Sequence, residues 1–275
     1  MDFADLFAGA YTVWYRDVIS LVRDRARLGS SLIMTAIMLV GVGFGLGGLI
    51  GKVGASGASP FGAASVPGVP FVQFIFPAIL AMTILGTALQ STMSIVYDRE
   101  FGFMRKILVA PVSRTSVALG KIGGGMTVAL IQAVLILLVA PFLGIKLTFA
   151  SLLLVLVVLV VLAATVTALG VLAASRQKSQ QGFQMINLLV MMPIMLLSMG
   201  AFLPSFGSGL LATAFRTVSL LNPVSYGIDA LRQIMLGSAM PANLVLHPLA
   251  LDVVVLAALF VAFLVPGVKL FAKQD

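Results

Sequence analysis

Cysteine is absent from this 275-residue chain, and histidine and tryptophan occur once each. Without cysteine the chain has no disulfide, no thiolate nucleophile and no thiolate metal site. The single histidine, His247, has no partners at the spacing of a Ser/His/Asp triad, a carboxylate pair or a metal-ligand cluster. The sequence therefore predicts no catalytic residue, no metal site and no cofactor held by this chain.

Charged side chains are also scarce, at 9% of the residues, whereas 60% are hydrophobic and the mean hydropathy is +1.15. Soluble domains usually carry about 25% charged residues, so the membrane is the expected solvent. The apolar runs do not alternate as strands of a membrane barrel would, and a helix needs roughly 20 residues to span the hydrocarbon core. We predict an all-α membrane protein, one domain over residues 1–275, with six transmembrane helices at about 29–51, 71–97, 117–143, 151–174, 183–203 and 249–271.

Acidic residues are outnumbered by basic ones, 9 to 17, which gives a net charge of +8. Cytoplasmic loops of membrane proteins collect Lys and Arg, so this excess needs no nucleic acid as a partner. With the N-terminus inside, thirteen of the basic residues fall on the cytoplasmic side and four outside. The start of the chain also lacks the layout of a cleaved signal peptide. We predict a multi-pass plasma-membrane protein with both termini in the cytoplasm.

The N-terminal segment carries apolar residues at spacings of three and four, with Trp14 in the apolar stripe and most charges on other faces. This pattern predicts an amphipathic helix over residues 1–28 that lies in the membrane interface. The alternative is a plain cytoplasmic extension of the first span. In the third predicted span, Gly120 and Gly124 form a small-residue pair of the kind that lets helices pack closely.

A nucleotide-binding loop is missing as well. Neither Gly51-Lys52 nor Gly120-Lys121 has the G-x-x-x-x-G-K-[ST] spacing that cradles phosphates, so the chain is not expected to bind ATP. Acids are nearly absent from the predicted spans, which leaves Asp252 as the candidate coupling acid if the protein is an ion-coupled carrier. A membrane scaffold without transport is a further alternative. By elimination, we expect the energy for transport to come from another polypeptide.

The charge that is present concentrates in residues 97–114, YDREFGFMRKILVAPVSR, between the second and third predicted spans. Six of these residues are charged, although a loop between two spans needs only a few polar residues. The segment is long and amphipathic enough to form a short helix outside the membrane. It is therefore a predicted docking surface for a partner.

Polar side chains share one face of the second predicted span, stepping by three and four: Thr83, Thr87, Gln90, Ser94 and Tyr97. Polar groups in hydrocarbon need partners or a cavity, so this stripe either joins helices through hydrogen bonds or lines a translocation path. Asn187 and Met191 lie near one face of the fifth span. After it, Asn222-Pro223 predicts a break between two short external or re-entrant helices. Asp229 and Arg232 are spaced to pair on the second of these.

Three stretches of the chain resemble the membrane subunit of type-2 ABC exporters, in the branch of daunorubicin-resistance permeases. The loop at residues 97–121 is similar to that family's loop between its second and third spans, through Glu100, Gly102, Leu108, Pro111, Val112 and Ser113. Residues 187–204 are similar to its fifth helix, although Ser198-Met199-Gly200 stands where Ser-Gly is usual. Residues 221–232, LNPVSYGIDALR, match its N-P-x-x-Y-x-x-D-x-x-R signature.

The resemblance implies a permease that pairs with a second permease subunit, expected to be identical, above two separate ATPase subunits that bind ATP and Mg²⁺. A coupling helix within residues 98–110 would seat on the ATPase. The implied coupling residues are Asp98, Arg99, Glu100, Gly102, Arg105, Pro111 and Ser113. The implied substrate path contains Thr83, Thr87, Gln90, Ser94, Asn187 and Met191. The implied external gate contains Asn222, Pro223, Tyr226, Asp229 and Arg232.

Two further expectations follow from this resemblance. Glu100 is expected to pair with a basic residue of the ATPase, because an acid gains nothing from an anionic lipid surface. The expected substrate is an amphipathic drug or a lipid-like molecule, since methionines give the path an adaptable apolar surface. A polysaccharide or glycolipid ranks second, because Trp14 is the single tryptophan and a sugar path would be denser in aromatic side chains.

Overall fold

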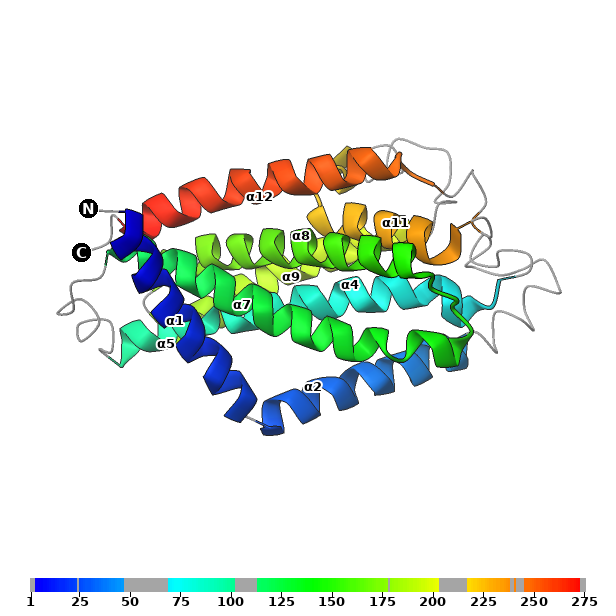
Figure 1. Ribbon diagram of the computed structural model, residues 1–275, viewed down its shortest axis with the longest axis horizontal. Helices are drawn as coiled ribbons and strands as arrows, with labels where there is room; N and C mark the ends of the chain where they lie inside the picture. Colours follow the sequence, from blue (N-terminus) through cyan, green and yellow to red (C-terminus); the bar gives the residue numbers. More distant parts are fainter. Residues whose placement is uncertain are drawn as a thin grey trace.

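The computed structural model describes residues 3–23, 25–46, 69–101, 113–177, 179–202, 217–237, 240 and 245–272. Helices hold most of these residues, and no strand occurs among them. The long helices run roughly along one axis, and the first helix lies obliquely across them (Figure 1). In chain order the elements are α1 (Phe3–Arg23), α2 (Arg25–Met38), the π-helix η1 (Leu39–Leu46), α4 (Phe71–Ser91), α5 (Met93–Glu100), α7 (Arg114–Leu137), the 3-10 helix η2 (Ala140–Leu143), α8 (Phe149–Ala174), α9 (Gln180–Phe202), α11 (Pro223–Leu236) and α12 (Leu249–Ala272).

Five helices within the described ranges are long and apolar enough to cross a membrane: Phe71–Glu100, Arg114–Leu137, Phe149–Ala174, Gln180–Ser198 and Leu249–Ala272. They lie where the second to sixth spans were predicted. The first predicted span begins in α2 and continues into η1, and its described part ends at Leu46. An all-helical membrane fold is therefore confirmed, and the count of six spans stays a prediction.

Side-chain caps fix where several helices begin. Ser113 accepts a hydrogen bond from the N–H of Ser116 at the start of α7, and Asn222 accepts one from the N–H of Val224 at the start of α11. Such caps satisfy N–H groups that have no partner inside the helix. Asn222 also donates to the carbonyl of Ile194 and the hydroxyl of Ser198 on α9, at 2.9 and 2.8 Å. The predicted break at Asn222-Pro223 is confirmed. The side chain of Asn222 also links α11 to α9 through these two hydrogen bonds.

The core of the bundle forms around α4, which packs against α7, α8 and α11. Phe76, Leu80 and Ile84 on α4 are fully buried. By contrast, few residues of α9 and α12 are buried within the chain. In a membrane protein such faces are left for lipid or for another subunit.

The N-terminal helix α1 packs across the end of α7, close to where α12 ends (Figure 1). Gly120 and Gly124 allow this contact: a Cβ on Gly120 would lie 2.6 Å from the carbonyl oxygen of Ala10, and one on Gly124 would lie 2.9 Å from the Cβ of Asp17. The predicted small-residue pair therefore does pack closely. Its partner is the amphipathic helix.

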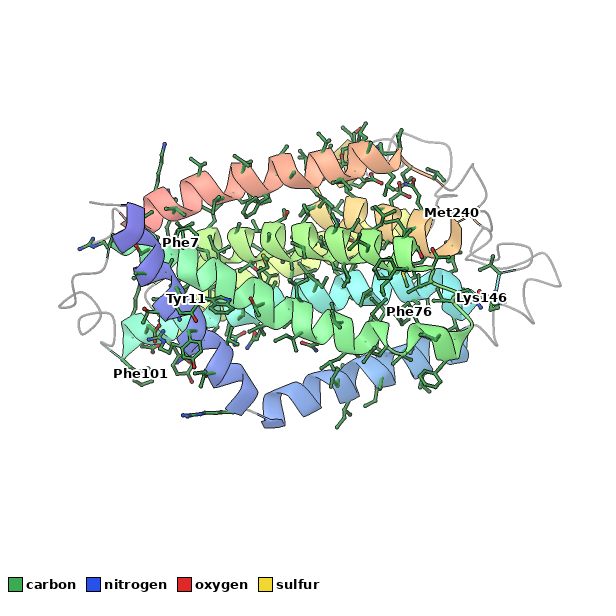
Figure 2. All side chains as sticks on the ribbon, viewed as in Figure 1. Phe7, Tyr11, Phe76, Phe101, Lys146 and Met240 are labelled. Carbon is green, nitrogen blue, oxygen red and sulfur yellow. The ribbon has the colours of Figure 1, made fainter. Side chains whose placement is uncertain are left out.

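The outer face of α1 is aromatic. Phe7 and Tyr11 point away from the bundle and are 68% and 59% exposed (Figure 2). Across the contact with α7, the indole Nε1 of Trp14 donates a hydrogen bond to the hydroxyl of Thr127 at 3.0 Å. Amphipathic aromatic side chains suit the water–lipid boundary, which supports the predicted interfacial position of α1.

Substituting Gly120 with alanine should loosen α1. The added methyl would overlap a backbone oxygen, and overpacking of this kind costs about 1–3 kcal/mol. We expect the melting temperature of the detergent-purified chain to fall by about 3–10 °C. Gly267→Ala is the matched control, because a Cβ there would meet its nearest neighbours at 3.6 Å, an ordinary contact. Equal melting temperatures for the two variants would contradict the close packing of α1 on α7.

Candidate functional site

Charged residues from three helices meet where α5 ends beside α1 and α7. The buried ammonium group of Lys121 on α7 lies 3.0 Å from a carboxylate oxygen of Asp98 and 3.3 Å from one of Asp17. Arg16 on α1 reaches Asp98 at 3.0 Å from the solvent side. Lys121 also donates to the hydroxyl of Ser94, one turn before Asp98. We call Arg16, Asp17, Asp98 and Lys121 the ion cluster.

The two residues after Asp98 bind two other helix ends. The guanidinium of Arg99 donates to the carbonyl oxygens of Ala174, Ser175 and Gln177, at 3.3, 2.9 and 3.1 Å, where α8 ends. The carboxylate of Glu100 accepts the N–H of Gln180 at 2.9 Å, where α9 begins. A cation at a helix C-terminus and an anion at a helix N-terminus each lie beside a partial charge of opposite sign, so both contacts stabilise the helix ends.

Three consecutive side chains thus join α5 to four neighbours. Asp98 binds α1 and α7, Arg99 binds the end of α8, and Glu100 binds the start of α9. The predicted coupling residues Gly102, Arg105 and Pro111 lie outside the described residues, as does most of the predicted coupling helix. Among the predicted coupling residues, Ser113 caps α7. The described residues on either side of the predicted coupling helix, at the end of α5 and the start of α7, therefore make several polar contacts.

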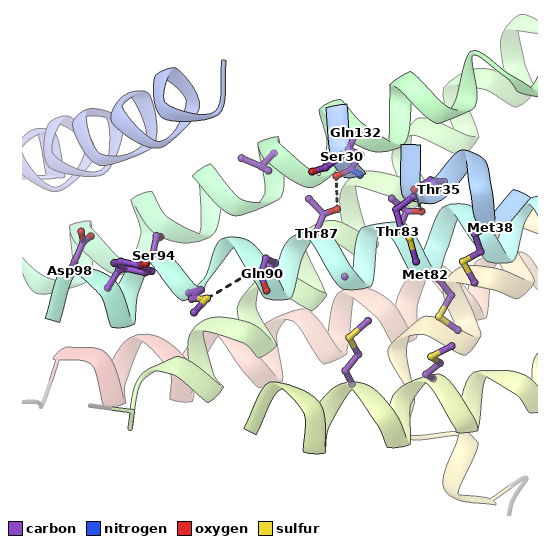
Figure 3. Close-up of a pocket in the computed structure, with 17 residues that line it drawn as sticks. Ser30, Thr35, Met38, Met82, Thr83, Thr87, Gln90, Ser94, Asp98 and Gln132 are labelled. Atoms are coloured by element: carbon purple, nitrogen blue, oxygen red, sulfur yellow. Dashed lines mark hydrogen bonds between the residues drawn. The ribbon is translucent and has the colours of Figure 1, made fainter. Parts of the chain in front are cut away.

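A cavity of about 700 Å³ lies beside the ion cluster, between α2, α4, α5, α7 and α9 (Figure 3). Its polar lining includes Thr83, Thr87, Gln90, Ser94 and Gln132. Its apolar lining is rich in methionine: Met34, Met38, Met82, Met93, Met191 and Met195. Ligand pockets commonly have volumes of about 300–1,000 Å³ with mostly apolar walls and a few placed polar groups.

The polar stripe of the second span both joins helices and lines the cavity. Thr87 donates to the side-chain oxygen of Gln132 on α7 at 2.5 Å (Figure 3). Gln90 lies exposed in the cavity, where its amide approaches the sulfur of Met93 at 3.6 Å. Residues of the stripe thus both join helices and line the cavity, and the translocation path stays a prediction. Of the predicted path residues, only Asn187 is absent from the lining, and its side-chain oxygen is buried without a hydrogen-bond partner.

Residues predicted at the external gate gather at the other end of the bundle. Tyr226 donates to the carbonyl of Leu220, and Asp229 accepts the N–H groups of Leu246 and His247 at 3.1 and 3.0 Å. The guanidinium carbon of Arg232 lies 4.2 Å from the centre of the Phe74 ring, a cation–π distance. The pairing of Asp229 with Arg232 stays a prediction. This end of α11 fixes the chain that enters α12.

Five apolar helices among the described residues, a cavity between helices and a charged cluster at one end of the bundle are features expected of a membrane transporter. The family model of the ABC-2 type transporter matches residues 9–236. The chain belongs to the ABC-2 type transporter family. The predicted daunorubicin-resistance branch is a finer assignment and stays a proposal.

Named relatives of this ABC-2 chain are permeases. A putative transport permease, ycf38, of Cyanophora paradoxa is 29% identical over 168 residues, which cover 59% of this chain and 55% of the relative. The probable multidrug ABC transporter permease YbhR of Escherichia coli K12 is 27% identical over 168 residues, covering 60% of this chain and 44% of the relative. The chain thus spans about half the length of these relatives. Members of the ABC-2 family are transport subunits rather than catalysts, and generally work with ABC ATPase subunits.

Proposed function

We propose that this ABC-2 chain is the permease subunit of an ATP-driven exporter, with an amphipathic drug or lipid-like molecule as its substrate. The observation that carries this proposal is the cavity beside the ion cluster. Six methionines give it a flexible apolar wall, and the hydroxyls and amides on α4 and α7 give it hydrogen-bonding groups without a ring of charge. Unbranched, polarisable methionine side chains adapt to ligands of different shape.

The connection to an energy source would run through α5. Asp98 and Ser94 belong both to the cavity lining and to the contacts with Lys121. A displacement of the segment after Glu100 would therefore move α5 and with it the cavity wall. Through the contacts of Arg99 and Glu100, the same displacement would also move α8 and α9. Helices joined by short polar contacts can move as one rigid body, and such a movement could change the shape of the cavity. The proposed partner at this segment is an ABC ATPase that binds ATP and Mg²⁺.

The second proposed partner is another permease subunit. The helix α9 lines the cavity with Met191 and Met195 and exposes Leu188 and Leu189 elsewhere on its surface. Another copy of the chain placed against this face would cover the apolar surface and enclose the cavity. We propose an identical copy, in the plasma membrane, with both termini in the cytoplasm.

A change at Gln90 tests whether the cavity binds substrate. Gln90→Leu removes the exposed amide from the middle of the wall, so we expect polar members of a drug panel to lose affinity by about tenfold, the effect of one lost hydrogen bond of about 1.4 kcal/mol. Substrate-stimulated ATPase activity of the complex in liposomes gives the half-saturating concentrations. Gln73→Leu is the matched control, because Gln73 lies on the same helix away from the cavity and donates to the carbonyl of Leu143. Unchanged concentrations across the panel for Gln90→Leu would contradict the assignment of this cavity.

A further inference from the structure

Three potential metal ligands from separate segments meet where the chain enters α12. Asp229 lies on α11, His247 lies in the loop between α11 and α12, and Asp252 lies in the first turn of α12. Each offers one ligand atom, and these atoms all lie within 4.8 Å of one another. The two carboxylates are buried, with residue exposures of 1% and 0%. Carboxylates held together away from water repel each other unless a proton or a cation lies between them.

Two atoms of this cluster have no hydrogen-bond partner: Nδ1 of His247 and Oδ1 of Asp252. They lie 3.6 Å apart. Leaving a buried polar atom without a hydrogen-bond partner lowers the stability of the fold by about 1–3 kcal/mol. A ligand bound by both atoms would remove this cost. The separation suits two ligands of one metal ion, since zinc binds imidazole nitrogen and carboxylate oxygen at about 2.0–2.2 Å.

Hydrogen bonds hold the Oδ2 atoms of both carboxylates in place. Gln233 donates to Oδ2 of both Asp229 and Asp252, at 3.2 Å in each case. The Oδ2 atom of Asp229 also accepts two backbone N–H groups, and the ring of His247 stacks on Tyr226 with 5.2 Å between centroids. Supporting contacts of this kind orient metal ligands and are typical of built metal sites.

We propose that Asp229, His247 and Asp252 form a binding site for one divalent transition-metal cation of the Zn²⁺ class. One imidazole and two carboxylates match the nitrogen and oxygen donors that Zn²⁺ takes, whereas Ca²⁺ takes six to eight oxygens. The side chain of His247 is 26% exposed, so an ion from solvent can reach the site at this residue. A bound ion would tie the loop before α12 to both α11 and α12. No local sequence pattern indicates this cluster, because His247 lies 18 positions after Asp229 and Asp252 lies 23 positions after it.

Zinc retention by the full chain tests this site. The chain is purified in detergent through a tag without histidine, so that His247 is the single imidazole, and then stripped with a chelator and dialysed against Zn²⁺. We expect one Zn²⁺ per chain by elemental analysis and a higher melting temperature, because a ligand that binds only the folded state stabilises it. His247→Gln and Asp252→Asn should each weaken Zn²⁺ binding at least about tenfold. Asp17→Asn, a carboxylate of the ion cluster at the other end of the bundle, is the control and should bind as the wild type does.

Either of two results would overturn the site: no stoichiometric Zn²⁺ on the folded wild-type chain, or equal retention by His247→Gln. A nitrogen-15 NMR spectrum of the single labelled histidine separates a metal from a proton. Zn²⁺ at the site shifts the ring signal at constant pH. A ring signal that responds to pH and ignores Zn²⁺ means that a proton alone balances the carboxylates, and this also overturns the proposal. Should Asp252→Asn fold poorly, His247→Gln decides, since its ring is partly exposed.

Discussion

Replacing Lys121 with methionine should release α1 from the bundle and lower the melting temperature by about 6–12 °C. The side chain of Lys121 is 2% exposed, and those of Asp98 and Asp17 are 17% and 18% exposed. Without the ammonium group, two largely buried carboxylates would face each other. Breaking a buried ion pair costs about 3–5 kcal/mol, and we expect about 3 kcal/mol because Arg16 still contacts both acids.

The single tryptophan makes the release of α1 directly measurable. Trp14 lies on α1 and donates to Thr127 on α7, so its fluorescence should shift to longer wavelength when α1 detaches. Arg16→Met is the matched control, because Arg16 is 43% exposed and exposed ion pairs contribute about 0–1 kcal/mol. Asp17→Asn added to Lys121→Met should recover part of the loss. A Lys121→Met chain with wild-type melting temperature and emission would show that the ion cluster does not hold α1.

The role of Lys121 marks a limit of prediction from sequence. Periodicity and long apolar runs predicted where the long apolar helices from residue 71 onward lie, with ends that differ from the structure by up to about six residues, because each is a local property of the chain. Lys121 carried only the general signal of a cytoplasmic basic residue. Its partner Asp17 lies 104 positions away, and no local pattern links the two. Gly120 and Gly124 predicted a close contact correctly, but the partner helix followed only from the fold.

The cavity shows the same division. Spacing by three and four placed Thr83, Thr87, Gln90 and Ser94 on one face, and this face does line the cavity. The methionines from α2 could not be included, because nothing in the sequence places α2 beside α4. Asn187 is absent from the lining of this cavity for a related reason: spacing decides which face of a helix a residue occupies, but packing decides which neighbour covers that face.

Glu100→Lys should strongly weaken the coupling of ATP hydrolysis to transport while leaving the chain in the membrane. This expectation rests on the proposed exporter function. The carboxylate of Glu100 accepts the N–H of Gln180 at the start of α9, and lysine would instead place a positive charge beside the partially positive N-terminus of that helix. We expect substrate-stimulated ATPase activity to fall by about tenfold or more, within the about 5–150-fold that coupling free energies usually span. Liposomes that contain the complex, assayed for both ATP hydrolysis and substrate flux, give the ratio of the two rates.

Glu100→Gln then decides between two roles for this residue. From the sequence, Glu100 is expected to pair with a basic residue of the ATPase, which requires its charge. In the structure its oxygen is already used within the chain, as a cap on α9, and the neutral side-chain oxygen of glutamine can accept the same N–H. If capping is what matters, Glu100→Gln keeps most of the flux per ATP that Glu100→Lys loses. If Glu100→Gln is as uncoupled as Glu100→Lys, the negative charge of Glu100 is what acts on the ATPase. The hydrogen bond to Gln180 is then not what couples ATP hydrolysis to transport.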